Sequence, residues 1–166
     1  MRELNIGNKA PDFQVMIAED KYFCLSEFIG KYIVLYFYPK DNTPGCNIEA
    51  QEFNLLFPEF QMLRAEIIGV SKDSLKSHDR FKDLLGLKFY LGADMTCNLC
   101  QKYGVLVEKS MFGKKYMGIT RMSFLIDKEG NIAFIWHKVK IEGHAQEVLD
   151  KIKELEEISR KKYSML

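Results

Sequence analysis

A chain of 166 residues in which 47% are hydrophobic can bury the core of one domain, and we expect a single domain over residues 1–166. The 24 basic and 23 acidic residues nearly cancel, which gives no reason to expect nucleic acid or an anionic membrane as a partner. The charged start over residues 1–5 lacks the apolar core of a signal peptide, and no apolar run reaches membrane-spanning length, so we expect a cytoplasmic protein.

The first elements along the chain are expected to be two short strands. They lie at about residues 13–17 and 21–25 and should pair as an N-terminal hairpin. Cys24 lies in the second strand between two apolar residues, where a packed and unreactive thiol is the expected state. Ser26 can then cap a short helix that runs through Ile29.

A buried strand follows and leads into a long helix. Residues 32–38 form an unbroken apolar and aromatic run, which is typical of a strand covered on both faces, and Pro39 ends it. Downstream, apolar residues recur at roughly helical spacing, which predicts a helix with Cys46 in its first turn. Pro58 interrupts this pattern, so we expect a bend near residues 55–57. The apolar stripe consists of Ile48, Phe53, Leu56, Phe57 and Phe60, and the glutamates expected to face water are Glu49, Glu52 and Glu59.

The next segments predict a parallel crossover. Residues 66–71 form another short apolar run, and their position after a helix indicates a right-handed strand, helix, strand connection in a partly parallel sheet. Asp73 or Ser74 can cap a helix that ends just before Gly86. His78 lies on the polar face of this helix, where we expect it to be solvated.

Two cysteines lie close together in the segment that follows. A short strand is expected at residues 89–91, and residues 94–96 can cap a helix that carries Cys97 and Cys100. Gly104 is expected to end this helix.

The last part of the chain predicts a hairpin and a final helix. Residues 119–126 and 132–136 should form two antiparallel strands, with Arg121 projecting from the first of them. A helical apolar stripe then extends over residues 145–161. Strands bracketed by helices predict a three-layer α/β sandwich with a central mixed sheet and an N-terminal β-hairpin.

The number and spacing of the cysteines indicate chemistry rather than a structural role. Four cysteines are too few and too unevenly placed for the disulfide framework of a secreted domain of this size. We therefore expect redox or catalytic use of at least one of them.

Cys46 has the setting of a nucleophile. A thiol in the first turn of a helix faces unpaired backbone N–H groups and the positive end of the helix dipole, and both favour the thiolate. Thr43 offers a hydroxyl three residues earlier, and Gly45 allows a substrate to approach the backbone. The alternative, a small buried hydrophobic cysteine, fits this setting less well.

The residues around Cys46 resemble those of a known family. Pro39, Thr43 and Cys46 form a Pro-x-x-x-Thr-x-x-Cys pattern that resembles the signature of the peroxiredoxins. The stretches that resemble the bacterioferritin comigratory protein, or peroxiredoxin Q, subgroup are YFYPK (36–40), TPGC (43–46), EA (49–50), GV (104–105), EKSMFGK (108–114) and GITRMSFLID (118–127), in the same order. They span nearly the whole chain, and the resemblance implies a thioredoxin-like fold.

The resemblance also implies an activity. It is that of a thiol-dependent peroxidase, which reduces hydrogen peroxide and organic hydroperoxides in antioxidant defence. Cys46 would attack the peroxide and become a sulfenic acid, and its backbone N–H would stabilise developing charge. Thr43 would hydrogen-bond the peroxide, Arg121 would hold both the thiolate and the oxygen, and Pro39 would shield the pocket. The resemblance implies neither a metal nor an organic cofactor.

The chain departs from the subgroup at the resolving cysteine, whose thiol would form a disulfide with the oxidised Cys46. The resolving cysteine of many members lies five residues after the first, and that position is Gln51 here. A second known position corresponds to Lys82. Three interpretations stay open: either Cys97 or Cys100 resolves Cys46 after the first helical turn unwinds, or thioredoxin or another external thiol reacts directly, or Cys24, the least expected of the candidates, is the resolving thiol. The subgroup resemblance favours a monomer.

The sequence Cys97-Asn98-Leu99-Cys100 supports two other interpretations. A Cys-x-x-Cys pair can be a redox disulfide, which would make the chain a general disulfide oxidoreductase, although Cys46 holds the place that thioredoxin motifs occupy. The pair also supplies half of a zinc site, which the three scattered histidines do not complete. A further alternative is a binding domain in which Cys46 is unreactive.

Overall fold

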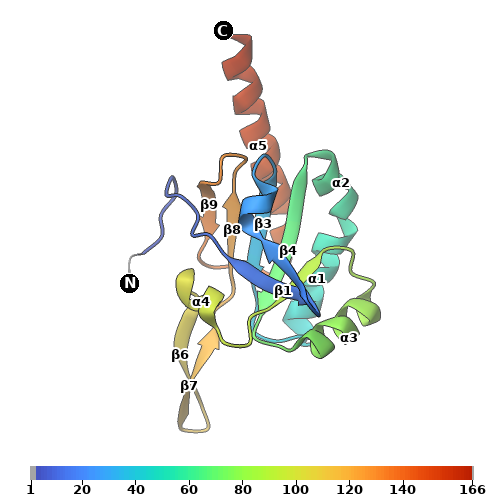
Figure 1. The fold of residues 1–166 in the computed structure, drawn as a ribbon, viewed down its shortest axis with the longest axis vertical. Helices are drawn as coiled ribbons and strands as arrows, with labels where there is room; N and C mark the ends of the chain where they lie inside the picture. The colour runs from blue at the N-terminus through green and yellow to red at the C-terminus, as the bar shows by residue number, and fades with distance from the viewer. Residues whose placement is uncertain (1–2, 166) are drawn as a thin grey trace.

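The computed structural model describes residues 3–165 as a seven-stranded mixed sheet flanked by helices (Figure 1). Its strands, in the order β2-β1-β5-β4-β3-β8-β9, are β1 (Gln14–Ala18), β2 (Lys21–Cys24), β3 (Tyr32–Phe37), β4 (Ala65–Ser71), β5 (Tyr90–Ala93), β8 (Met122–Ile126) and β9 (Ile132–Trp136). A separate two-stranded hairpin consists of β6 (Leu106–Met111) and β7 (Lys114–Ile119). The helices are the 3₁₀ helix η1 (Leu25–Phe28), α1 (Pro44–Leu55), α2 (Phe57–Met62), α3 (Leu75–Leu85), α4 (Asn98–Lys102) and α5 (His144–Ser164).

Strand β3 forms the middle of the core. All of its residues are buried, and it pairs in parallel with β4 and antiparallel with β8. The predicted buried strand, the parallel crossover and the antiparallel pair β8–β9 are therefore confirmed. The predicted N-terminal hairpin is also confirmed, since β1 pairs antiparallel with β2.

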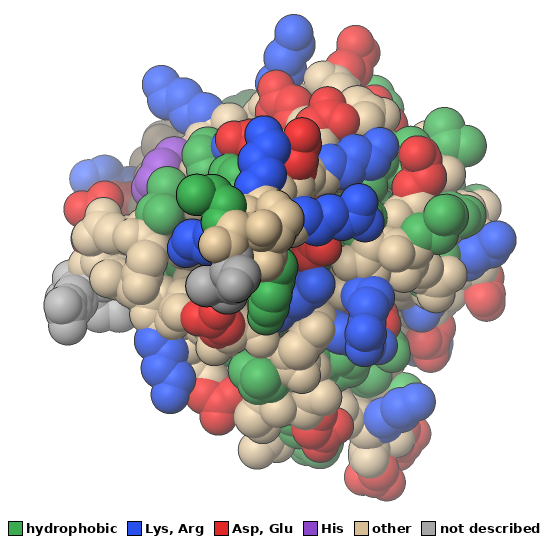
Figure 2. All heavy atoms as spheres, turned by 90° about the horizontal axis from the view of Figure 1, so that it is seen from above, with side chains coloured by type: hydrophobic (Ala, Val, Ile, Leu, Met, Phe, Trp, Pro, Cys, Tyr) green, Lys and Arg blue, Asp and Glu red, His purple; other side chains and the backbone are tan. Residues whose placement is uncertain are grey.

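The surface carries both signs of charge. Basic and acidic side chains are interspersed over the face shown in Figure 2, which agrees with the near balance of 24 basic and 23 acidic residues. Within residues 3–165, the helices do not offer a stretch that is both long and apolar enough to cross a membrane.

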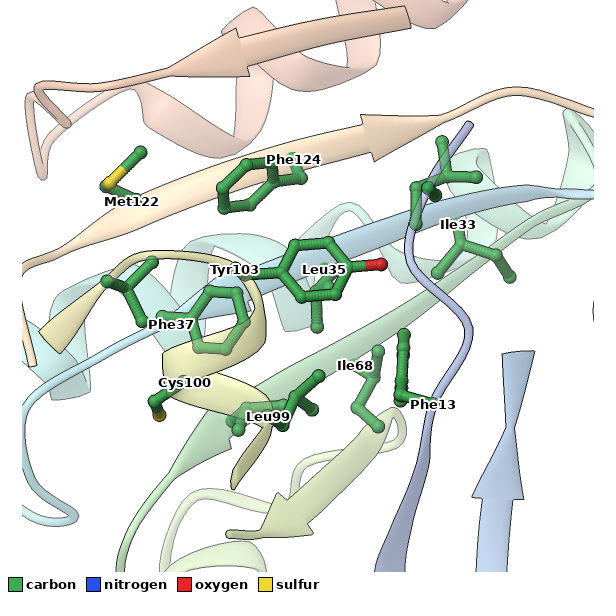
Figure 3. Close-up of a cluster of buried hydrophobic side chains, with 14 of the residues drawn as sticks. Phe13, Ile33, Leu35, Phe37, Ile68, Leu99, Cys100, Tyr103, Met122 and Phe124 are labelled. Atoms are coloured by element: carbon green, nitrogen blue, oxygen red, sulfur yellow. The ribbon is translucent and has the colours of Figure 1, made fainter. Parts of the chain in front are cut away.

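The sheet separates two clusters of buried side chains. Because neighbouring residues of a strand point to opposite faces, Ile33, Leu35 and Phe37 lie in one cluster with the residues of α4, as Figure 3 shows. Val34 and Tyr36 point to the other cluster, which α1, α2, α3 and α5 cover. We refer to these as the α4-side cluster and the α1-side cluster. Cys46 belongs to the α1-side cluster.

The helix boundaries follow the local signals. Pro58 lies in the first turn of α2, where a missing N–H is tolerated, and the expected bend falls between α1 and α2. Of the two candidate caps for α3, Ser74 is the one used, because its hydroxyl accepts the N–H of Ser77 at 3.1 Å. Gly86 ends this helix in the left-handed conformation, with φ of 64°.

Two expectations about local structure are wrong, and one hairpin was not predicted. The segment expected to be one strand over residues 119–126 is divided, since β7 ends at Ile119 and β8 begins at Met122, so Arg121 lies in the connection between them. The hairpin β6–β7 was not predicted, because its mostly exposed residues mix charged and apolar types without a clear pattern. Ser26 lies inside η1 rather than capping it, and Cys24 precedes the helix.

Gly69 of β4 leaves no room for a larger side chain. It lies beside Tyr36 of β3, and a Cβ added there would come within 2.7 Å of the Tyr36 ring. The ring cannot easily retreat because it stacks on Phe53 at 4.8 Å. Gly69→Ala should therefore lower the free energy of unfolding by about 1–3 kcal/mol, measured by chemical denaturation.

Gly118→Ala is the matched control. Its added Cβ would meet Lys109 Cδ at 2.8 Å, but that atom belongs to a flexible side chain that can move aside. A loss of stability at Gly69→Ala no larger than at Gly118→Ala would contradict the tight packing of Tyr36.

Candidate active site

Cys46 lies at the junction of β3 and α1. Helix α1 begins at Pro44 after Thr43, which has the extended backbone of an N-cap residue. Cys46 is therefore in the first turn, as predicted, and its side chain points into the α1-side cluster with only 2% exposure. The backbone N–H groups of this turn precede the first intrahelical partners and are oriented toward the space before the helix.

Arg121 reaches Cys46 from the connection between β7 and β8. Its Nη2 donates to Cys46 Sγ at 3.3 Å, and its Nη1 donates to Glu49 Oε1 at 2.6 Å. Burial opposes the charge, but Glu49 and Cys46 outweigh it and raise the pKa of Arg121. The guanidinium is therefore a fixed cation beside the sulfur, held from two sides.

Glu49 does not face water, contrary to our expectation. Its side chain is buried, with 1% exposure, and forms the ion pair with Arg121. Burial raises the pKa of Glu49 to about 7, although Arg121 acts in the opposite direction. Among the described residues, its second oxygen, Oε2, finds no hydrogen-bond partner. The spacing in the sequence could have indicated that Glu49 lies on the same face of the helix as Cys46. Residues three apart on a helix share a face, and Glu49 follows Cys46 by three.

Thr43 and Gly45 shape the approach to the sulfur. The Thr43 hydroxyl donates to the carbonyl of Lys40 at 3.0 Å, so its oxygen remains available as an acceptor. A Cβ at Gly45 would lie 2.8 Å from Ile141 Cδ1 and 3.3 Å from Arg121 Nη2. Glycine is therefore what lets the cation approach this turn. Pro39 is half-buried and lies two residues after the end of β3, at the start of the loop that leads to Thr43.

That loop is anchored by a second buried cluster, which includes His78. We expected His78 to be solvated, but its side chain is buried, with Nδ1 2.7 Å from Asp41 Oδ2. Burial opposes ionisation of Asp41, yet its hydrogen bonds with His78 and Tyr38 outweigh burial and lower its pKa. The helical pattern of α3 alone could not reveal a buried acid on another segment.

The same cluster contains the residues that come closest to metal-site geometry. Among residues 3–165, the ligand atoms of Asp41, Asp73 and His78 lie within 4.8 Å of one another. These atoms already have hydrogen-bond partners within the protein, so the group is an internal hydrogen-bonded network.

Cys97 and Cys100 lie on the other side of the sheet from Cys46. Cys100 is fully buried in the α4-side cluster, and burial together with Asp94 raises its pKa. Cys97 precedes α4 in a left-handed conformation and packs against the same cluster. The Asp94 carboxylate accepts the N–H of Leu99 at 3.1 Å and of Cys100 at 2.8 Å, so a cap from residues 94–96 is present. The expectation that the helix carries Cys97 is wrong, because the left-handed backbone of Cys97 places it before the first helical residue.

The arrangement at Cys46 suits attack on a small electrophile. The Cys46 sulfur lies at the helix terminus and beside Arg121, and the N–H groups of this turn can stabilise charge that develops on a substrate oxygen. The structure brings together Cys46, Thr43 and Arg121, with Pro39 at the start of the same loop. It does not bring Cys97 or Cys100 to them, and it leaves Cys24 half-buried at the end of β2.

Comparison with known proteins gives consistent results. The AhpC/TSA family profile matches residues 6–135. The curated protein "Putative peroxiredoxin bcp" of Coxiella burnetii is 44% identical over 149 residues, which cover 90% of this chain and 99% of that protein. "Peroxiredoxin Bcp" of Bacillus subtilis is 46% identical over 154 residues, which cover 93% of this chain and 98% of that protein.

Solved structures of similar proteins have the same fold as this chain. A cysteine-to-serine mutant of PrxQ from Xylella fastidiosa has a TM-score of 0.86 and 41% identity, covering 93% of this chain and 98% of that one. The bacterioferritin comigratory protein of Xanthomonas campestris, studied for alkyl peroxide reduction, has a TM-score of 0.83 and 40% identity, covering 90% of this chain and 98% of that one. These likenesses confirm the expected thioredoxin-like fold.

Proposed function

The chain belongs to the AhpC/TSA family as a thiol-dependent peroxidase of the Bcp, or peroxiredoxin Q, type, and we propose that Cys46 is the thiol that attacks the peroxide. The observation that supports this assignment is the 3.3 Å contact between Arg121 Nη2 and Cys46 Sγ at the N-terminus of α1. The substrates are hydrogen peroxide and small organic hydroperoxides, in line with the alkyl peroxide reduction studied in the Xanthomonas campestris relative.

The first step is nucleophilic attack. The Cys46 thiolate forms a bond to one peroxide oxygen while the O–O bond breaks. The other oxygen leaves with the electron pair, takes a proton from solvent and departs as water or an alcohol. Cys46 remains as a sulfenic acid, two electrons more oxidised than the thiol.

The residues around the sulfur have separate roles in this step. Since the Thr43 hydroxyl hydrogen is used on Lys40, its oxygen accepts the O–H of the peroxide and orients it. Arg121 and the backbone N–H of Cys46 stabilise the charge that moves onto oxygen. Glu49 holds Arg121 in place through the 2.6 Å ion pair, and Pro39 limits access of water.

For the second half of the cycle we propose that an external thiol reduces the sulfenic acid. Cys46 packs in the α1-side cluster, whereas Cys97 and Cys100 pack in the α4-side cluster, so an internal disulfide would require both regions to open. An external thiol condenses with the sulfenic acid and releases water, and a second thiol then exchanges with this disulfide to restore Cys46. Thioredoxin or another cytoplasmic thiol is the proposed reductant, and the four free cysteines suit a reducing compartment.

Oxidation with one equivalent of hydrogen peroxide tests both parts of the proposal. After free thiols are blocked, non-reducing peptide mass spectrometry should find oxygen added to Cys46, with Cys24, Cys97 and Cys100 blocked as free thiols. Adding a small thiol before blocking should convert Cys46 to the mixed disulfide. Cys97→Ser and Cys100→Ser, treated in the same way, should leave the Cys46 products unchanged.

Two other outcomes would contradict the proposal in different ways. A disulfide between Cys46 and Cys97 or Cys100 would replace the external thiol by an internal resolving cysteine, while leaving the role of Cys46 intact. Consumption of peroxide with Cys46 unmodified would overturn the assignment of Cys46 itself.

A further inference from the structure

A buried carboxylate, that of Asp41, helps to attach the loop from Pro39 to Thr43 to the rest of the protein. Asp41 is 7% exposed. Its carboxylate accepts hydrogen bonds from the Tyr38 hydroxyl at 2.5 Å and the Ser77 hydroxyl at 2.8 Å, and it lies 2.7 Å from Nδ1 of His78. These partners come from the residue after β3 and from α3. Asp41 therefore joins the end of β3 to a helix that is distant in sequence.

The backbone of the same residue is also held. The Asp41 N–H donates to Asp73 Oδ2 at 2.9 Å, and the Ser71 hydroxyl donates to that same oxygen at 2.6 Å. On the other side of Asp41, Asn42 has a left-handed backbone, with φ of 54°, and its side-chain oxygen accepts from Asn47 of α1 at 3.2 Å. The loop is thus fixed before and after Asp41.

The hydrogen-bond partners show how the two side chains are joined. His78 Nε2 lies 3.0 Å from the carbonyl oxygen of Gly92, which can only accept, so Nε2 carries a hydrogen. Nδ1 lies 2.7 Å from Asp41 Oδ2, so a hydrogen lies between the imidazole and the carboxyl group as well. Asp41 and His78 therefore form a buried hydrogen-bonded pair.

A buried polar pair of this kind needs an explanation, because removing polar groups from water is costly. Neither group takes part in the attack on the peroxide, since the contacts of Cys46 Sγ and of Glu49 are with Arg121. The pair instead holds the backbone at Asp41, two residues before Thr43. The Thr43 hydroxyl donates to the carbonyl of Lys40 within the same loop.

We propose that Asp41 and His78 are positioning residues for the peroxidase reaction, which hold the loop so that the Thr43 hydroxyl meets the peroxide oxygen. This inference rests on the proposed function of Cys46 and Thr43. A carboxylate fits the role because it accepts several donors at once from fixed directions. An amide at this position cannot accept on its nitrogen, so the loop loses one of its attachments.

The test compares two electrophiles that react with the same sulfur. In Asp41→Asn, the second-order rate constant with hydrogen peroxide should fall by about 10- to 100-fold, because a small misplacement of a positioning group has effects of that size. The rate constant with iodoacetamide should stay within about 2-fold of the parent value, because alkylation of the sulfur does not need the Thr43 hydroxyl. His78→Asn breaks the pair from its other side and should give the same pattern.

A double-mutant cycle shows whether Asp41 acts through Thr43. Thr43→Val removes the hydroxyl but leaves the rest of the turn. If the proposal is correct, Asp41→Asn has no further effect on the peroxide rate in a Thr43→Val background. Additive losses would overturn it, and so would an equal fall of the peroxide and iodoacetamide rates, which would mark Asp41 as a purely structural residue.

Two further variants serve as a control and as a replacement for Asp41→Asn. Ser74→Ala removes the N-cap of α3 without touching Asp41, so it weakens the same helix and should leave the ratio of the two rates unchanged. If Asp41→Asn does not fold, Ser77→Ala removes one donor to the carboxylate and should lower the peroxide rate alone, by a smaller factor. Retained peroxide reduction in Cys46→Ser would instead refute the proposed function on which this inference rests.

Discussion

Replacing Cys46 with serine is expected to remove peroxide reduction almost completely, by at least about 10⁴-fold in kcat/KM. Serine has nearly the same shape, but its hydroxyl stays protonated at neutral pH even beside Arg121, so the attacking anion is lost. The measurement is the loss of hydrogen peroxide with a small thiol as reductant, which avoids any dependence on a particular protein partner.

The other cysteines provide the controls for this variant. Cys24→Ser, Cys97→Ser and Cys100→Ser keep Cys46 and its contact with Arg121, so each should retain the parent rate with the small thiol. Reduction of protein disulfides that survives loss of Cys46 but not of Cys97 or Cys100 would instead support a disulfide oxidoreductase. Substantial peroxide reduction by Cys46→Ser would mean that another group attacks the peroxide.

Loss of the Arg121 charge should have the second largest effect. In Arg121→Gln, kcat/KM for hydrogen peroxide should fall by about 10²- to 10³-fold, the range seen when one donor to a developing oxyanion is removed. Two causes act together, since the thiolate loses its nearest cation and the departing oxygen loses a donor. The variant also leaves the buried Glu49 carboxylate without its partner, so unfolding should be measured in parallel.

Two related variants separate charge from position. Arg121→Lys keeps the charge but not the planar group that contacts Glu49 and Cys46 together, so an intermediate loss is expected. Glu49→Gln keeps Arg121 and removes only the charge that fixes it, so its loss should be smaller than that of Arg121→Gln. Equal activity of Arg121→Gln and the parent protein would show that Arg121 is not part of the reaction.

Helix α1, which carries Cys46, and strand β3, which precedes it, could be predicted because their signals in the sequence are local. An unbroken apolar run gives β3, proline and glycine give its end and the helix start, and the spacing of the following apolar residues gives α1. The placement of Cys46 in the first turn follows from these signals alone. The hairpin β6–β7 could not be predicted in this way, because its exposed residues carry no periodic pattern.

The buried charges could not be predicted, because each depends on a partner far away in sequence. Glu49 pairs with a residue 72 positions later, and Asp41 with one 37 positions later. A helical pattern assigns charged residues to the water-facing side by default, and only the folded chain shows which carboxylate has a cation beside it. The separation of Cys46 from Cys100 is likewise a matter of topology, since it depends on which face of β3 each helix covers.

The burial of Cys46 means that molecular size, as well as electrophilic strength, selects what it reacts with. Its side chain is 2% exposed, whereas the half-buried Cys24 and Cys97 are open to larger molecules. A bulky oxidant or label should therefore react with these two thiols before it reaches Cys46. We therefore expect compact hydroperoxides to reach the sulfur at the first turn of α1 more easily than bulky oxidants do.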